Sequence, residues 1–344
     1  MFLTEDRQMV QVTFRKFRHL YKKGIYLLHY DSRIHKYYFR RWGVDGEKHF
    51  SAPSTAAQKL KALCRCLFCG PIRFSPSDGG AVEEFLVTYR RYIKVFDGAN
   101  QTVTTYGCSD EQLQLAERYR EKYSAFFSPY ILAIDRPGRR VTETYIRHRE
   151  GWAADPAAYR AFADWLIDSY CRYAAAVPLS EVSFVSAADV TAELRRTADG
   201  GLQRLLAHIA PAWGPYGSIP LPLIDNHNDV KPDNILYDGQ RFYLIDYEMF
   251  RPNLLGFDIL MYALLAAFRY RDDRLLTDYR SGRYDVPLAQ VFSRFGIPFD
   301  AQRRDALLYL ALLFGMRHSL AMFGSIQTAA WDKLFAALTG AGEP

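Results

Sequence analysis

The chain has 344 residues, which suggests one large domain or two, and 49% of the residues are hydrophobic, so a sizeable core is possible. The formal net charge of +6 is too small to predict a dedicated nucleic-acid binder. The first residues lack the apolar core of a signal peptide, and the longest apolar run, 254–268, is short for a membrane span. We therefore expect a soluble, cytoplasmic protein with no nucleic-acid partner.

The five cysteines do not predict a disulfide framework, because their number is odd and no secretion signal accompanies them. Cys64, Cys66 and Cys69 form a cluster, whereas Cys108 and Cys171 stand apart. The cluster could supply three zinc ligands, but no close fourth ligand follows it. Reduced, partly buried thiols are the favoured interpretation.

Residues 1–70 are predicted to form an N-terminal extension that is basic and aromatic, most clearly at 14–23 and 35–42. Alternating residues at 25–30 and 36–42 predict strands. The positive charge has two interpretations: attraction to an anionic surface, such as membrane headgroups or an acidic glycan, or a solvated face on extra strands. We favour the second, since charged faces are commonplace.

Residues 71–146 are predicted to be rich in strands around one helix. Ser109 suits the N-cap of that helix, and Asp110 and Glu111 fall in its first turn. The expected elements are a strand-like run at 84–96, its hairpin partner at 101–106, a helix at 110–126, and strands at 130–134 and 140–146.

From residue 147 onward the chain is predicted to be mainly helical. Helical spacing occurs at 157–175, 188–209, 258–270, 286–295, 301–323 and 328–338.

The most constrained pattern in the chain is flanked by two strand-like runs. The segment from His227 reads His-x-Asp-x-x-x-x-Asn, with Asp229 and Asn234 at its fixed positions, and Asp246 follows an apolar pair twelve residues after Asn234. This order is typical of phosphoryl transfer, in which one carboxylate orients the attacking hydroxyl, and an amide and a second carboxylate hold magnesium. An Asp/Asn-rich hairpin turn would explain Asp238-Gly239 but not the register of the other four residues.

The chemistry assigns each residue an expected role. Asp229 orients the acceptor hydroxyl and accepts its proton, while Asn234 and Asp246 bind magnesium that bridges the phosphates of ATP. His227 braces the loop through hydrogen bonds. Lys231 either contacts the γ-phosphate and neutralises charge on the acceptor side, or faces solvent.

Two acidic residues after the motif have supporting roles. Glu248 is expected to support the second metal or the loop. Asp258 begins a helix, and we expect it to cap that helix or to anchor the catalytic loop.

The nucleotide-binding signals in the first 146 residues are weaker. Phosphate binding in this chemistry uses a Lys on the third strand, paired with a Glu on the next helix. Lys94 has a strand context, and Glu117 is its preferred partner. The alternative partners are Glu121 and Glu111. If the strand that carries Lys94 is instead the second, the Lys position falls on Thr104 or Thr105, and the usual Lys is missing.

The phosphate-binding loop is also indistinct. Residues 75–80 read Ser-Pro-Ser-Asp-Gly-Gly, and they are the only candidate before the strands. Their backbone N–H groups could hold phosphate, although such a sequence also forms ordinary turns.

At these motifs the chain resembles the aminoglycoside phosphotransferase and choline kinase-like superfamily. In that superfamily an aromatic residue and often Glu follow the metal-binding Asp, as Tyr247-Glu248 do here. The resemblance implies an α+β, bilobal protein-kinase-like fold with a β-rich N-lobe at 71–146 and a mainly helical C-lobe at 147–344. It also implies ATP and Mg²⁺ as cofactors, and a hinge at Glu143–Ile146, including Tyr145, that meets adenine through backbone groups.

The expected function is therefore phosphorylation of a hydroxyl on a small molecule or a glycan. The basic, aromatic extension and the compact segment after Asp246 favour a sugar or envelope-glycan precursor. If the extension is attracted to an anionic surface, it would also contact a membrane surface. A Ser/Thr protein kinase-like enzyme is an alternative, because Lys231 follows Asp229 by two residues, but Asp-Phe-Gly and Ala-Pro-Glu motifs are absent from the sequence. A catalytically degenerate module that binds a nucleotide or a partner is the second alternative, supported by the indistinct phosphate loop and the uncertain Lys94.

Overall fold

The structure is a computed structural model that describes nine stretches of the chain. These are residues 24–31, 36–41, 72–74, 84–87, 92–97, 100–149, 151–197, 199–217 and 219–339, the first four as backbone strands only. They divide into two compact units. The first unit holds the described residues up to Arg120 together with Tyr130–Arg147, and the second holds Glu121–Pro129 and the described residues from His148 onward.

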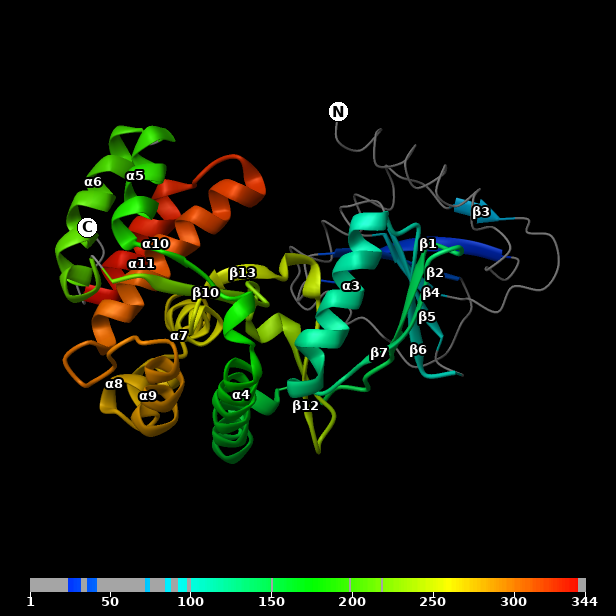
Figure 1. Ribbon diagram of the computed structural model, residues 1–344. Coiled ribbons are helices and arrows are strands. Elements are labelled where there is room, and N and C mark those ends of the chain that lie inside the picture. Colours follow the sequence, from blue (N-terminus) through cyan, green and yellow to red (C-terminus); the bar gives the residue numbers. More distant parts are fainter. Residues whose placement is uncertain are drawn as a thin grey trace. The chain divides into compact units, whose positions relative to one another are not determined.

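The first unit is built on an antiparallel sheet, whose described strands pair in the order β3-β1-β2-β4-β5-β6-β8-β7 (Figure 1). These strands are β1 (Gly24–Asp31), β2 (Lys36–Arg41), β3 (Ile72–Phe74), β4 (Glu84–Val87), β5 (Ile93–Asp97), β6 (Thr102–Tyr106), β7 (Ile131–Asp135) and β8 (Arg140–Thr144). β1 and β2 confirm the strands expected at 25–30 and 36–42. Because β2 pairs with β4, these N-terminal strands belong to the same sheet as the later ones.

The helix of the first unit is α3 (Asp110–Lys122), which runs beside the strands in Figure 1. Ser109 caps it as expected: its hydroxyl accepts from the N–H of Gln112 at 3.3 Å, and the Gln112 side chain accepts from the N–H of Ser109 at 3.1 Å. The helix ends at Lys122 rather than at residue 126. A separate 3-10 turn, Ser124–Phe126, follows it, and Tyr123 lies between the two.

The second unit is mainly helical, so the expected α+β organisation is confirmed. Its helices are α4 (Pro156–Ala176), α5 (Ala187–Thr197), α6 (Gly200–Ile209), α7 (Phe257–Arg269), α8 (Arg274–Ser281), α9 (Asp285–Arg294), α10 (Arg304–Phe323) and α11 (Thr328–Thr339). One helix was expected at 188–209, but Asp199 interrupts it. The Asp199 side chain accepts from the N–H of Leu202 at 2.8 Å and so begins α6 as a new helix.

Two small sheets flank the His-x-Asp-x-x-x-x-Asn segment and Asp246 in the second unit. β10 (Leu221–Asn226) lies between β13 (Arg251–Leu254) and β9 (Ser183–Val185), and β11 (Ile235–Tyr237) pairs with β12 (Phe242–Leu244). The turn between β11 and β12 confirms the hairpin expected at Asp238-Gly239. There the Asp238 carboxylate accepts from the N–H groups of Gln240 and Arg241 at 2.7 and 2.8 Å.

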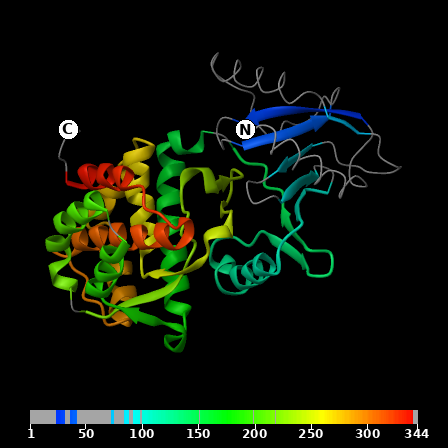
Figure 2. The same cartoon turned by 90° about the horizontal axis from the view of Figure 1, so that it is seen from above.

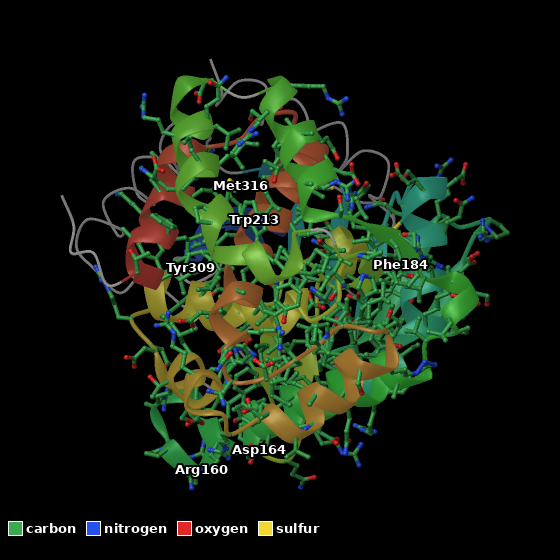
Figure 3. All side chains as sticks on the ribbon, turned by 60° about the vertical axis from the view of Figure 1, so that its left-hand side comes forward. Arg160, Asp164, Phe184, Trp213, Tyr309 and Met316 are labelled. Atoms are coloured by element: carbon green, nitrogen blue, oxygen red, sulfur yellow. The ribbon has the colours of Figure 1, made fainter. Side chains whose placement is uncertain are left out.

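Helix α10 lies at the centre of the second unit, where it packs against α5, α7, α11 and the 3-10 helix η5 (Ala210–Tyr216). Figure 2 shows α10 and α11 in orange and red. Met316 of α10 and Trp213 of η5, both labelled in Figure 3, are 0% and 5% exposed. By length and composition α10 could span a membrane, but its residues from 306 to 316 are mostly buried inside this unit, as in a core helix.

Gly315 permits close packing of α11 on α10, because a Cβ atom there would lie 2.5 Å from the Trp331 ring. We expect Gly315→Ala to lower the free energy of unfolding by about 2 kcal/mol through overpacking, despite the better helix propensity of Ala. Chemical denaturation measures this change. Gly200→Ala is the matched control, since a Cβ atom at residue 200 would lie 3.9 Å from its nearest neighbour, the Arg204 side chain. Equal effects of the two substitutions would show that the contact with Trp331 does not matter.

Candidate active site

The catalytic loop starts directly after β10, which is buried along most of its length. Pairing with β13 and β9 on its two sides fixes the backbone of β10, and hence the position at which His227 begins the loop. The loop ends in the 3-10 turn Pro232–Asn234, which leads into β11. The motif therefore lies on irregular backbone that regular structure holds at both ends.

Asp258 anchors this loop to the start of α7. It is 1% exposed, and its carboxylate accepts from the backbone N–H groups of His227 at 2.7 Å and Asn228 at 2.8 Å. The Tyr123 hydroxyl donates to the same carboxylate at 2.6 Å. Burial raises the pKa of Asp258, while His227 and these three donors oppose the rise. Of the two expected roles, anchoring the loop is the one observed, since the carboxylate accepts from the loop N–H groups and the N-cap of α7 is Gly256.

His227 connects the loop to the strand end before Asp246. Its ring is fully buried, and Nε2 lies 3.0 Å from the carbonyl oxygen of Ile245. Because a carbonyl only accepts hydrogen bonds, Nε2 carries the ring proton. Burial lowers the pKa of His227, with Asp258 and Asp246 acting in the opposite direction. A neutral, buried imidazole in this position can hold the loop but has no access to a reacting group.

Asn228 fixes the loop from the other side, a role that the sequence analysis missed. Its φ of 64° places it in the left-handed region, which Asn tolerates better than most residues. The side-chain amide donates to the carbonyl oxygens of Asn226, Met249 and Arg251 at 2.9, 3.1 and 2.9 Å. Asn253 donates to the Asn228 amide oxygen at 2.7 Å. The choice of Asn beside the catalytic Asp was the only signal for this role in the sequence.

Asp229 is partly buried and has two side-chain partners. Lys231 donates to its two carboxylate oxygens at 2.8 and 2.6 Å, and the Asn234 amide nitrogen donates to Oδ2 at 2.9 Å. Burial raises the pKa of Asp229, whereas Lys231 and Asn234 lower it. Both partners therefore favour the ionised carboxylate that would accept a proton. The observed position of Lys231 is beside Asp229 rather than out in solvent.

Asn234 and Asp246, the two residues expected to bind metal, meet at the base of the β11–β12 hairpin. Ile245 donates its N–H to the carbonyl oxygen of Asn234 at 2.9 Å, and Asp246 follows with a left-handed φ of 69°. The Asp246 charge also raises the pKa of Asp229. Strained backbone of this kind is concentrated at functional sites.

These side chains suit magnesium. The Asn234 nitrogen is used by Asp229, so its amide oxygen is the atom left for a cation. Among the described residues, no group of three or more His, Cys, Asp or Glu side chains could hold a metal ion by itself. A cation here would take one carboxylate and one amide oxygen from the protein and its other ligands from phosphate and water, as Mg²⁺ commonly does.

The expected Lys94–Glu117 pair is wrong. Glu117 instead forms a bidentate ion pair with Arg136, which lies in the turn between β7 and β8. Lys94 lies on β5, directly opposite Thr105 of β6, so both side chains point to one face of the sheet. β6 is the strand that directly precedes α3, as the third strand of the expected lobe would. The topology therefore matches the alternative in which Thr104 or Thr105, rather than Lys94, takes the position of the usual Lys.

Glu143 is the carboxylate that the sheet places on the Lys94 face. Val103 faces Glu143 across β6 and β8, and the alternation along the strands puts both residues on the same side as Thr105 and Lys94. Burial raises the pKa of the Cys108 thiol to about 11, and the charges of Glu143 and Lys94 act on it in opposite directions. Glu143 and Lys94 therefore lie on one face of the sheet.

The predicted adenine hinge begins inside a strand. Glu143 belongs to β8, which is flanked by β6 and β7, so its backbone pairs within the sheet. Tyr145 is past the strand end, and its N–H donates to the carbonyl oxygen of Gln101 at 2.9 Å. A nucleotide base could reach backbone groups only beyond Glu143, so the role given to Glu143 is corrected and that of Tyr145 stays a prediction.

Several expectations concern residues outside the described ranges. They are the phosphate-loop candidate at 75–80, the cysteines Cys64, Cys66 and Cys69, and the basic stretch at 14–23.

A cavity of about 420 Å³ in the second unit opens beside Asn228 and Asp229. It lies between α7, α10 and α11 and is lined mainly by apolar side chains. These include Met249, Phe257, Met261, Phe323, Trp331 and Leu334. His318 also lines it, and burial, assisted by the Arg251 charge, lowers the pKa of His318 to about 4. The volume is within the range of small-molecule sites.

Residues 144–290 match a family model whose description is phosphotransferase enzyme family. The match confirms the resemblance stated from the motif and supports a kinase-like phosphotransferase enzyme. It spans the catalytic loop, Asp246 and Asp258. It also favours a small-molecule phosphotransferase over the protein kinase-like alternative.

Solved structures of similar shape include three phosphotransferases. A choline/ethanolamine kinase family protein from Mesorhizobium loti is 17% identical, with 74% of this chain and 85% of that chain covered and a TM-score of 0.44. Aminoglycoside phosphotransferase APH(4)-Ia is 14% identical, with coverage of 84% and 100% and a TM-score of 0.47. Choline kinase LicA from Streptococcus pneumoniae is 12% identical, with coverage of 83% and 100% and a TM-score of 0.45. A search of curated proteins finds no match.

The hydroxyl of Tyr123 should contribute to the stability of the catalytic loop. Tyr123→Phe removes a buried hydrogen bond to the Asp258 carboxylate, so we expect the free energy of unfolding to fall by about 2 kcal/mol. Urea denaturation measures the loss. Tyr309→Phe is the control, because the Tyr309 hydroxyl, labelled in Figure 3, has no hydrogen-bond partner among the described residues. A Tyr123→Phe variant as stable as the control would contradict the anchoring role.

His318 should make stability depend on pH below 6.5. Above pH 6.5 the imidazole is neutral in both folded and unfolded chains. As the pH falls from 6.5 to about 4, the unfolded chain gains a proton that the folded chain lacks. The stability of the wild type relative to His318→Gln should therefore decrease by up to about 1.4 kcal/mol per pH unit in this window and stay constant above pH 7. Denaturation curves at several pH values test this, and a constant difference throughout would rule it out.

Proposed function

Because residues 144–290 match the phosphotransferase enzyme family, we propose that this protein transfers the γ-phosphoryl group of ATP to an alcohol of a small molecule. The observation that carries the proposal is the Asp229 carboxylate, which lines the cavity and is held by Lys231 and Asn234. This is the position that an acceptor hydroxyl must approach for a carboxylate to orient it.

In the proposed reaction, the acceptor hydroxyl donates a hydrogen bond to Asp229 and loses its proton to it as the oxygen bonds to the γ-phosphorus. The bond from that phosphorus to the bridging oxygen breaks, and ADP leaves. Lys231 favours the ionised form of Asp229 before the step and limits the build-up of negative charge beside it. Asn234 and Asp246 would hold Mg²⁺, which neutralises phosphate charge when bound.

Three further parts of the proposal concern the nucleotide and the acceptor. Lys94, on the sheet of the first unit, would contact phosphate, and backbone groups near Tyr145 would bind the base. A sugar or envelope-glycan precursor would be the acceptor, as the basic and aromatic N-terminal segment suggests. Placement on a membrane surface through that segment belongs to the same proposal.

Binding of nucleotide should be separable from transfer. With Mg-ATP at about 100 times its Kd, we expect the melting temperature to rise by about 5 °C, because a ligand bound only by the folded state stabilises it. Asp246→Asn should lose the magnesium-dependent part of this rise. Asp229→Ala should keep the rise but lower the rate of phosphoryl transfer at least about 100-fold.

Asp168→Asn is the control, since Asp168 is an exposed carboxylate on α4 that pairs with Arg172. Thermal shift and product formation are measured on the same four proteins. Unchanged Mg-ATP binding in Asp246→Asn would refute its role as a metal ligand. No shift with any nucleotide would favour the catalytically degenerate alternative.

A further inference from the structure

The cavity beside Asp229 has apolar walls supplied by three helices. Phe257 and Met261 come from α7, Phe323 from the end of α10, and Trp331 and Leu334 from α11. Gly315 lets the Trp331 ring lie directly on the α10 backbone. The position of the ring is therefore set by backbone contact, and the cavity has a defined apolar wall before any ligand enters.

The described lining offers no spare negative charge to a cationic acceptor. Its two carboxylates are Asp229 and Asp258. Asp258 is buried and accepts three hydrogen bonds inside the protein, and Asp229 is paired with Lys231. His318 is neutral at pH 7, and the nearby charge of Arg251 disfavours another cation there. An amine buried in this cavity would lose its hydration without gaining an ion pair.

Phe323 indicates which part of an acceptor would lie at the exposed edge of the cavity. It is 60% exposed although it lines the cavity, and it is followed by exposed Ser325 and Gln327. Large apolar side chains at the edge of an apolar cavity commonly contact ligand. Polar groups of a ligand could meet Ser325 and Gln327 at the surface while its apolar part covers Phe323.

We infer that the acceptor is a neutral alcohol with an apolar body, and that Phe323 and Trp331 are the residues that select it. The hydroxyl would lie at Asp229, with the apolar body between α7, α10 and α11. Phosphorylation of the bound alcohol rests on the proposed function. The selectivity of the cavity for such an alcohol does not depend on it. The inference narrows the proposed sugar acceptor to one that carries an apolar substituent and excludes polycationic amino sugars.

Three glucosides that differ in one substituent test this selectivity by calorimetry with the full chain. Methyl β-D-glucoside carries the hydroxyls alone, hexyl β-D-glucoside adds an apolar body, and 6-aminohexyl β-D-glucoside places a cation at the end of that body. We expect hexyl glucoside to bind at least about tenfold more tightly than either of the others, because the added methylenes are buried without charge. Equal affinities for all three, tightest binding of the aminohexyl compound, or no binding of any would overturn the inference.

Single substitutions locate the binding site. Phe323→Ala should weaken hexyl glucoside about fivefold or more while leaving methyl glucoside unchanged. Phe184→Ala is the matched control, because Phe184 on β9, labelled in Figure 3, is 51% exposed and does not line the cavity. If both substitutions have the same effect, the apolar body does not bind at Phe323 and the inference is wrong.

Binding and turnover separate the two proposals. Selective binding of hexyl glucoside without a phosphorylated product in Mg-ATP would support the cavity's selectivity and count against the proposed function. Phosphorylation of hygromycin B that depends on Asp229, with tighter binding than hexyl glucoside, would support the proposed function and overturn this inference.

Discussion

The site depends on one buried carboxylate. Asp258 accepts hydrogen bonds from two successive backbone N–H groups of the catalytic loop, at 2.7 and 2.8 Å, from within the apolar environment at the start of α7. A buried charge is tolerated only where its hydrogen bonds are satisfied, so the loop and the carboxylate stabilise each other. Tyr123 completes the set of donors and packs on Phe127 with ring centroids 4.4 Å apart. The segment after α3 is thereby tied to the catalytic loop.

The anchored loop can hold backbone conformations that would otherwise be unfavourable. Asn228 and Asp246 both adopt left-handed φ angles, 64° and 69°, next to the residues that would perform the chemistry. Hydrogen bonds from Asn228 to three carbonyl groups offset part of the cost at the first position. At the second, the His227 contact with Ile245 fixes the residue just before the turn. Both left-handed conformations are stabilised by neighbouring, well-packed structure.

Charge is distributed unevenly around this loop. At one end of the loop, Asp229, Asn234 and Asp246 form a polar group, and the Asp246 charge raises the pKa of Asp229. Beside Asp229, the cavity between α7, α10 and α11 is lined mainly by apolar side chains, with a neutral His318 in its wall. A phosphoryl transferase needs both environments, because charged phosphates require cations whereas acceptor selection can depend on apolar contact.

The sequence determined the order of catalytic residues, the strands that flank them and the Asp238-Gly239 hairpin. These features depend on residue type and short spacing, which local chemistry constrains strongly. The sequence also predicted the strands β1 and β2 and the N-cap at Ser109. Tertiary structure decided the rest, beginning with the partner of Glu117. Glu117 lies near Arg136 because the β7–β8 turn reaches α3, a contact that helix spacing cannot reveal.

Sheet register similarly placed Glu143 on the Lys94 face, since a shift of one residue would have turned it away. The cavity was outside the reach of sequence reasoning for a related reason. Its walls combine helices about 60 residues apart in the chain, and their apolar residues look the same as core residues until packing leaves space between them. The sequence by itself thus predicted the residues for phosphoryl transfer, while only long-range packing formed the cavity beside Asp229.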